Sequence, residues 1–217
     1  MGLITAWSFS RYNTYQQCPF KLKCSAVLKL KEPETEPMLK GQRVHKAGED
    51  YVKGIAKKLD PAFKLFKPQM LELRKAKAQT ELSWGFTKTW EPCGFFDKGV
   101  WCRIKTDVLE TLPSGVVRVI DYKTGSMYPE HADQLGLYAL GAFKMTPTLK
   151  SAQCEDWYLD NGQRSFEVFE AKGMKKLQAT WEKKVAPMLA DERLLPTKNK
   201  WCGRCHYRKA NGGPCEL

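Results

Sequence analysis

The spacing of hydrophobic residues predicts helices toward both ends of the chain and strands in the middle. Residues 39–59 repeat hydrophobic side chains every three or four positions, which is typical of a helix with one buried face. The residues on that face are Val44, Ala47, Tyr51, Val52 and Ile55. At residues 82–86 the period shortens to two, as in a half-buried strand. This change of period predicts an α/β fold.

Turn and capping residues divide the rest of the chain. Ser8 and Ser10 are capping candidates for a short helix that Pro19 interrupts. The other predicted elements are a helical stretch at 61–78, strands at 100–112 and 116–122, a helix at 130–143, a hairpin of 151–159 and 164–170, and a helix at 172–192. We expect one domain over 1–217, with a basic helical region (1–80), a sheet core (81–170) and a C-terminal helix followed by a cysteine-rich tail (171–217).

Charge is distributed unevenly over these regions. The formal net charge is +12, and the first 80 residues carry 16 Lys or Arg against 7 Asp or Glu. Residues 81–130 carry 6 against 7, so the sheet region is the only locally acidic part. A basic body around an acidic centre suits a protein that attracts phosphates and holds cations among them. Nucleic acid is therefore the first candidate partner, with a merely basic, soluble protein as the alternative.

Two groups of residues are candidate nucleic-acid contacts, although each has a simpler explanation. A run of basic side chains could track a phosphate backbone or could form a solvated helix face. It consists of Lys53, Lys57, Lys58, Lys64, Lys67, Arg74, Lys75 and Lys77. Tryptophans could stack on bases, but core positions are the better expectation. They are Trp84, Trp90, Trp101 and Trp157.

No apolar run is long enough to cross a membrane, and the N-terminus lacks the features of a secretory signal. We therefore expect no membrane partner and a cytoplasmic location, in a bacterium or a phage-infected host cell. Eight cysteines without an export signal indicate reduced thiols or metal ligands rather than disulfides.

Two carboxylates and a lysine form the main candidate site. Asp121 and Lys123 are two residues apart at the end of a strand, so they point to the same face. A hairpin with the preceding strand would bring Asp107 beside Asp121. Two adjacent carboxylates favour a bound cation, and oxygen ligands suit Mg²⁺ or Mn²⁺. An isolated Asp-x-Lys is more often a surface ion pair, so the context decides.

Four segments together resemble the PD-(D/E)XK nuclease superfamily, and within it the RecB-like branch. They are GQRVHKAGE with His45, RIKTD ending at Asp107, VIDYKTG with Asp121 and Lys123, and QLGLY with Gln134 and Tyr138. The resemblance implies a restriction-endonuclease-like core, in which helices flank a central mixed β-sheet. It also implies metal-dependent hydrolysis of phosphodiester bonds in DNA.

The resemblance assigns roles to these residues. The metal ligands would be His45, Asp107, Asp121 and the carbonyl of Tyr122. The catalytic residues would be Asp107, Asp121, Lys123, Gln134 and Tyr138. Gln134 and Tyr138 are four apart, so on a helix they share one face. Glu81 and Glu110 are weaker candidates for positions near the site.

Four cysteines near the two ends of the chain form a second candidate metal site. Cys202 and Cys205 have a chelating Cys-x-x-Cys spacing, Cys215 follows, and Cys18 could supply a fourth thiolate. This arrangement resembles the iron–sulfur nucleases of the same superfamily, which implies a 4Fe-4S cluster that staples the chain ends together. Zn²⁺ would suit four thiolates equally well, and Cys24 or His206 could replace a ligand.

The function expected from the sequence is an exonuclease that acts on DNA that is single-stranded or has free ends, in replication, recombination or repair. A replication or recombination protein is a candidate partner. Two alternatives stay open: a non-catalytic nucleic-acid-binding module that keeps the fold, and a nuclease subunit of a larger complex.

Overall fold

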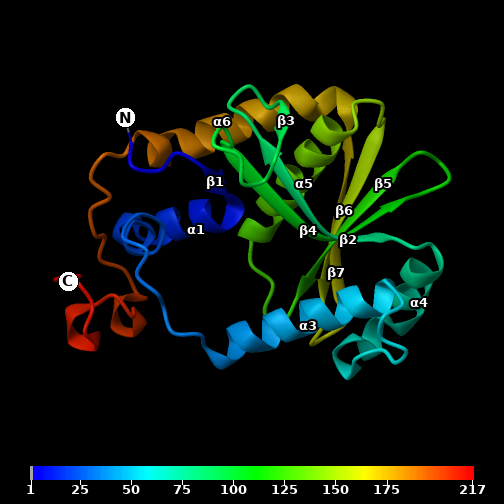
Figure 1. The fold of residues 1–217 in the computed structure, drawn as a ribbon, viewed down its shortest axis with the longest axis horizontal. Helices are drawn as coiled ribbons and strands as arrows, with labels where there is room; N and C mark the ends of the chain where they lie inside the picture. The colour runs from blue at the N-terminus through cyan, green and yellow to red at the C-terminus, as the bar shows by residue number, and fades with distance from the viewer. Residues whose placement is uncertain (1) are drawn as a thin grey trace.

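A mixed sheet with helices on both faces forms the centre of the protein (Figure 1). The computed structural model describes residues 2–217. The strands are β1 (Trp7–Ser8), β2 (Gln79–Phe86), β3 (Pro92–Cys93), β4 (Cys102–Thr111), β5 (Val117–Lys123), β6 (Ser151–Tyr158) and β7 (Gln163–Glu170). Their order is β3-β2-β4-β5-β6-β7, and β1 pairs with β4. The β5–β6 and β1–β4 pairs are parallel and the others are antiparallel.

Helices cover both faces of this sheet. The α-helices are α1 (Phe9–Gln17), α2 (Pro19–Leu22), α3 (Glu36–Val52), α4 (Lys67–Lys75), α5 (Glu130–Met145) and α6 (Met174–Ala190). Short turns of other helix types are η1 (Lys23–Val27), η2 (Pro61–Phe66), η3 (Ala171–Gly173), η4 (Cys202–Arg204) and η5 (Lys209–Asn211). In Figure 1, α5 and α6 lie above the sheet and α3 and α4 lie below it.

Alternation along the strands gives each face its own hydrophobic core. On β5, Val119 packs in the cluster that contains α5 and α6, whereas Ile120 packs in the cluster that contains α3 and α4. Successive side chains of a strand point to opposite faces, which explains the division. The central strand β5 is therefore buried on both faces of the sheet.

Most of the elements predicted from periodicity are confirmed. Ser8 caps α1 by accepting a hydrogen bond from the backbone N–H of Arg11 at 3.3 Å. The prediction of a helix up to residue 59 was wrong, because α3 ends at Val52 and Ile55 is 68% exposed. The helical stretch predicted at 61–78 is divided near Pro68 into the short turn η2 and the helix α4; Pro68 lies in the first turn of α4, where its missing N–H costs little. No helix within residues 2–217 has the length and hydrophobicity needed to span a membrane.

Helix α5 is the connection that places the site. It leaves the end of β5 and returns the chain to the start of β6, which runs parallel to β5. A parallel pair requires such a crossover, so α5 lies against the sheet and presents one face to the C-terminal end of β5. That face carries Gln134 and Tyr138.

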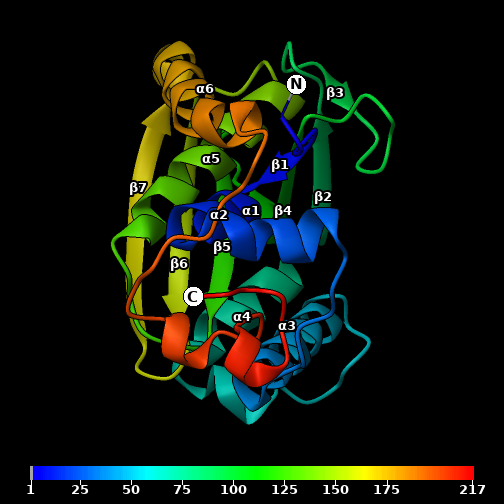
Figure 2. The ribbon, with the colours of Figure 1, turned by 90° about the vertical axis from the view of Figure 1, so that its left-hand side faces the viewer.

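The two ends of the chain meet at one side of the sheet. Asn199 donates a hydrogen bond to the carbonyl of Gln17 at 2.8 Å, and the Tyr207 hydroxyl donates one to the carbonyl of Leu30 at 3.0 Å. Figure 2 shows the C-terminal segment in front of the sheet, next to the N-terminal helices. The tail is therefore packed against the N-terminal region.

A pair of glycines on α3 gives a test of the packing behind the site. A Cβ at Gly48 would lie 2.7 Å from the Phe63 ring and 2.8 Å from the Tyr122 ring, whereas a Cβ at Gly41 would meet only Thr124 Oγ1 at 3.6 Å. We expect Gly48→Ala to destabilise the fold by roughly 1–3 kcal/mol. Gly41→Ala should stabilise it by up to about 1 kcal/mol, since alanine favours helix. Urea denaturation of both variants checks this, and equal midpoints would contradict it.

Candidate active site

The sheet divides at the point where the candidate acids lie. Strands β4 and β5 pair from Thr111↔Val117 to Val108↔Ile120, and there the pairing stops. The next residues are Asp107 on β4 and Asp121 on β5. Beyond this fork β4 stays paired with β2, and β5 stays paired with β6. The fork opens a space between two strands that are each held by another neighbour.

Asp107 joins three elements at the fork. Its Oδ1 lies 2.8 Å from Nδ1 of His45 on α3, and its Oδ2 accepts a hydrogen bond from the backbone N–H of Tyr122 at 2.6 Å. Burial and the charge of Asp121 raise the pKa of Asp107 to about 6, against the opposing effects of His45 and the Tyr122 N–H. Burial lowers the pKa of His45, but the neighbouring carboxylates outweigh burial and raise it.

A third acid completes a cluster that suits a cation. Donor atoms of His45, Glu81 and Asp107 all lie within 4.8 Å of one another. The β2–β4 register would place Glu81 opposite Asp107, but Glu81 has a φ of 55° and that pair is missing from the ladder. A positive φ is strained for a non-glycine residue and recurs at functional sites. The distorted backbone at Glu81 thus occurs at a residue whose carboxylate lies in the cluster with His45 and Asp107.

Asp121 and Lys123 are held by side chains from α5. Lys123 Nζ lies 2.6 Å from Oδ2 of Asp121 and donates a hydrogen bond of 2.6 Å to Oε1 of Gln134. Gln134 Nε2 donates to the Tyr138 hydroxyl at 2.6 Å, and that hydroxyl donates to Oδ1 of Asp121. The four side chains form a closed ring of hydrogen bonds, which fixes the lysine and the carboxylate in one geometry.

The charges in this ring are kept ionised by their partners. Burial alone would raise the pKa of Asp121, but the charge of Lys123 and its hydrogen bond outweigh burial and hold that pKa below its ordinary value. Burial likewise opposes the charge of Lys123, yet Asp121 and Asp156 raise its pKa. The site therefore offers an ionised carboxylate, that of Asp121, beside the protonated amine of Lys123.

Comparison with known proteins identifies the family. The model of the PD-(D/E)XK nuclease superfamily matches residues 6–210, almost the whole chain. The chain belongs to this superfamily. The α/β core with a mixed sheet between helices is the architecture that the sequence predicted, and the family supports a nuclease that binds nucleic acid.

Comparison of this PD-(D/E)XK nuclease with solved structures gives two matches of low sequence identity. A protein from Eubacterium rectale, provisionally named as an exonuclease, is 12% identical with a TM-score of 0.53, covering 94% of this chain and 88% of that chain. A protein named SSO0001 is 14% identical with a TM-score of 0.44, covering 100% of this chain and 90% of that chain. No curated protein sequence matches. At these identities the first likeness supports the fold alone, and the second carries no weight.

The nuclease fold brings together the residues that the four sequence segments singled out. His45, Asp107, Asp121, Lys123, Gln134 and Tyr138 are joined by the contacts described above, and Tyr122 contributes its backbone N–H. Glu81 lies in the cluster, although the sequence gave it little weight. Glu110 was wrongly considered near the site, because its carboxylate pairs with Arg118 at 3.0 Å in the part of β4 and β5 that stays paired, before the fork.

Sequence reasoning missed Asp156. This fully buried carboxylate lies opposite Asp121 in the β5–β6 register, and its Oδ1 is 3.6 Å from Lys123 Nζ. Ser165 donates a long hydrogen bond to its other oxygen at 3.4 Å. Burial raises the pKa of Asp156 to about 7, against the opposing charge of Lys123. The available signal was the acidic pair Glu155–Asp156 inside an otherwise apolar strand.

Asp156 makes the stability of the metal-free nuclease dependent on pH. Its pKa is about 7 in the folded protein but about 3.9 in an unfolded chain. Between these values only the folded state holds the proton, so stability falls as pH rises from 4 to 7. At pH 8 we expect metal-free Asp156→Asn to exceed the parent in stability by roughly 2–4 kcal/mol, with the difference shrinking toward pH 5. Urea denaturation at both pH values measures it.

Asp160→Asn is the matched control, since Asp160 is exposed and pairs with Lys40 at 2.8 Å. That variant should follow the parent at both pH values. Parallel curves for Asp156→Asn and the parent would show that Asp156 keeps an ordinary pKa.

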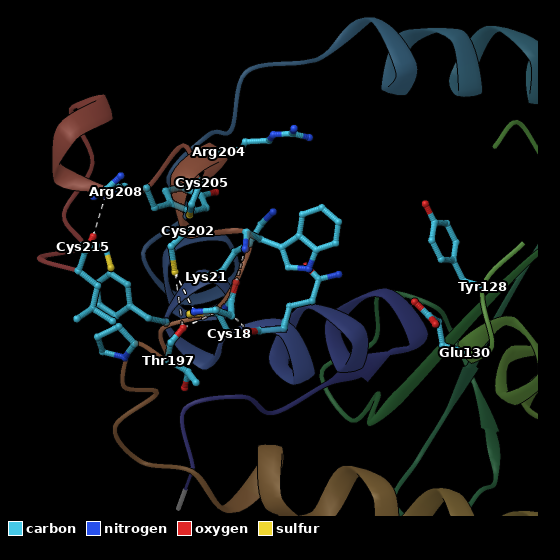
Figure 3. A pocket seen from close by; sticks show the side chains of 17 residues that line it. Cys18, Lys21, Tyr128, Glu130, Thr197, Cys202, Arg204, Cys205, Arg208 and Cys215 are labelled. Atoms are coloured by element: carbon cyan, nitrogen blue, oxygen red, sulfur yellow. Dashed lines mark hydrogen bonds between the residues drawn. The ribbon is translucent and has the colours of Figure 1, made fainter. Parts of the chain in front are cut away.

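The four cysteines of the second candidate site line a single cavity. Cys18 from the N-terminal region and Cys202, Cys205 and Cys215 from the tail border a space of about 400 Å³, and Figure 3 shows them on one side of it. Burial, with a smaller contribution from the nearby Cys215, Cys205 and Cys18, raises the pKa of Cys24 to about 11. Cys93, Cys102 and Cys154 lie on strands β3, β4 and β6.

Proposed function

We propose that this protein is a divalent-metal-dependent exodeoxyribonuclease of the RecB-like branch, acting on DNA that is single-stranded or has free ends. The observation that carries the proposal is the convergence of His45, Asp107, Asp121 and Lys123 at the fork between β4 and β5. If Asp121 and Lys123 formed only a buried ion pair that stabilises the fold, no imidazole and no further carboxylates would be needed around them. Glu81, Asp107 and His45 lie within 4.8 Å of one another, and Asp121 lies across the fork, which is chemistry suited to a cation and a phosphate.

The donor atoms fit Mg²⁺ or Mn²⁺. Glu81 and Asp107 offer carboxylate oxygens and His45 offers a ring nitrogen within 4.8 Å of one another. Asp121 and the carbonyl of Tyr122 would complete the site from β5. A bound divalent ion would lower the pKa of a water and stabilise charge that develops on the phosphate. The imidazole donor favours Mn²⁺ somewhat more than an all-oxygen site would.

The residues of the ring would position the attacking water and the scissile phosphate. Lys123 Nζ, fixed by Asp121 and Gln134, would donate a hydrogen bond to the phosphate or exchange a proton with the water. Tyr138 would hold the Asp121 carboxylate in the orientation that a ligand needs. Asp156 would keep the amine charged from behind.

Four cysteines line one cavity, and four is the number of thiolate ligands that a 4Fe-4S cluster or a zinc ion takes. We propose that Cys18, Cys202, Cys205 and Cys215 bind a 4Fe-4S cluster, with Zn²⁺ as the competing occupant. The preference for iron rests on the resemblance of this spacing to iron–sulfur nucleases. Bound there, either metal would staple the tail to the N-terminal helices.

Cleavage of defined DNA tests the proposed activity. End-labelled single-stranded and double-stranded DNA, linear and circular, are incubated with the purified protein and Mg²⁺ or Mn²⁺. An exonuclease degrades the linear forms and leaves the circles intact. Cleavage of circles would show an endonuclease, and binding without cleavage in either metal would show a non-catalytic module or a subunit that needs a replication or recombination partner.

A further inference from the structure

The cysteine cavity has a second wall that no metal would occupy. Besides the cysteines, its lining includes Phe20, Lys21, Tyr128, Trp201 and Arg204. Figure 3 shows Tyr128 and Glu130 on the side opposite the cysteines, with the Arg204 side chain between the two walls. The lining thus combines aromatic rings and cations around one hollow.

Two of these rings are unusually open for large aromatic side chains. Trp201 is 50% exposed and Tyr128 is 51% exposed, although both line a concave surface. By contrast, Trp84, Trp90 and Trp157, which the sequence offered as base-stacking candidates, are buried in the two cores. The rings available to a ligand therefore come from the tail and from the start of α5.

The charges beside the rings favour an anion. Lys200 Nζ lies 5.0 Å from the centre of the Trp201 ring, and Arg204 lines the cavity. Lys21 is partly neutralised by Glu32 at 3.3 Å. Glu130 is the one carboxylate side chain of a described residue in the lining. An aromatic surface with excess positive charge is the arrangement that binds unpaired bases and their phosphates.

A chain of side-chain contacts links the Tyr128 wall of the cavity to the candidate active site. The Tyr128 ring lies 5.5 Å from the His131 ring, and His131 Nδ1 lies 2.8 Å from the Tyr158 hydroxyl. Tyr158 is the register partner of Lys123 across β5 and β6. Glu130 precedes Gln134 by about one turn of α5. The Tyr128 wall and the residues of the fork are therefore held by neighbouring parts of the fold.

We propose that the surface formed by Trp201, Tyr128 and Arg204 binds single-stranded DNA, with bases stacked on the two rings and a phosphate held by Arg204. The proposal rests on the proposed nuclease function, because it supplies the path by which a strand reaches the fork. It also makes the cysteine segment a wall of the substrate site in addition to a staple. A duplex is excluded from this role because its base faces are already stacked.

Binding of a labelled oligothymidylate of about 12 nucleotides tests the proposal. Fluorescence anisotropy is measured in EDTA, so that no cleavage occurs and the result does not depend on catalysis. We expect Trp201→Ala and Tyr128→Ala each to weaken binding roughly 5- to 100-fold. The control is Phe96→Ala, because Phe96 is 85% exposed beside Arg103 but lies outside the cavity. It should bind as the parent does.

An abasic oligomer of the same length separates stacking from charge. The parent should bind it more weakly than oligothymidylate by a similar factor, and Trp201→Ala should then have little further effect. If the losses of affinity from the abasic oligomer and from Trp201→Ala were additive, the stacking proposal would be overturned. It would also be overturned if Trp201→Ala weakened duplex binding as much as it weakens binding of oligothymidylate. Because Trp201 adjoins Cys202, the metal content of the Trp201→Ala variant is measured. If that variant has lost metal, the binding result of Tyr128→Ala, on the opposite wall, decides whether the rings stack on bases. Stacking without cleavage would refute the proposed activity and leave this site intact.

Discussion

Lys123→Gln is expected to lower the rate of DNA cleavage by roughly 10²- to 10⁴-fold while DNA binding stays near that of the parent. Glutamine keeps a polar end group on a slightly shorter side chain but carries no charge and no transferable proton. Lys123 Nζ contacts Asp121, Gln134 and Asp156, so its loss disorders the ring and removes the amine that we propose to act on the attacking water. Single-turnover cleavage of a labelled strand with Mn²⁺ measures the rate.

The same change leaves Asp121 and Asp156 buried without their cation, which costs stability as well as activity. Lys123→Arg separates the loss of activity from the loss of stability, because arginine keeps the positive charge beside Asp121 and Asp156. A guanidinium does not give up a proton and does not reproduce the geometry of an amine. We expect a folded but nearly inactive protein.

Lys184→Gln is the matched control for Lys123→Gln. It also removes an acid-paired lysine, since Lys184 lies 2.5 Å from Asp133, but on α6 and away from the fork. This variant should cleave as the parent does. A folded Lys123→Arg enzyme with parental activity would refute the role of the amine.

Cys205→Ser is expected to remove both the cofactor and much of the stability. Anaerobically purified parent protein should show the visible absorption of sulfur-to-iron charge transfer and contain iron, and the variant should lose both. Cys18 and Cys202 are close to opposite ends of the sequence, so the staple closes a loop of almost the whole chain. Loss of such a link lowers the free energy of unfolding by on the order of 5 kcal/mol.

Cys93→Ser provides the comparison, because Cys93 is also partly exposed but lies on β3, outside the cavity. It should retain iron and parental stability. A colourless parent with stoichiometric zinc would replace the cluster by zinc at the same four ligands. Protein free of both metals, with Cys205→Ser as stable as the parent, would remove the proposed metal site.

Local patterns in the sequence predicted much of this architecture because most elements follow from short-range periodicity and turns. The hairpin that carries Asp107 and Asp121 depends on a short connection, so its pairing was foreseeable. Helix α3 ended early because Gly54 takes a positive φ of 80°, which the hydrophobic repeat does not reveal. The β1 strand is too short to leave a pattern.

Asp156 and Glu81 were harder to predict, because both depend on relations between distant segments. Asp156 becomes a neighbour of Lys123 only through the parallel register of β5 and β6. Glu81 enters the cluster through a backbone distortion rather than through strand alternation. The open rings of Trp201 and Tyr128 likewise depend on how the tail folds against α2 and α5, which no local signal determines.

The fork has a consequence for the order of folding. Asp107 and Asp121 lie on the two arms of one hairpin, and hairpins form within about 1–10 μs. His45 arrives with α3, and Gln134 and Tyr138 arrive with the α5 crossover, which are contacts of longer range and slower formation. An early species would therefore hold two facing carboxylates, with Lys123 beside Asp121 but before His45 reaches Asp107 and before α5 fixes the lysine. We expect mild acidity or divalent ions to speed refolding, by neutralising that repulsion.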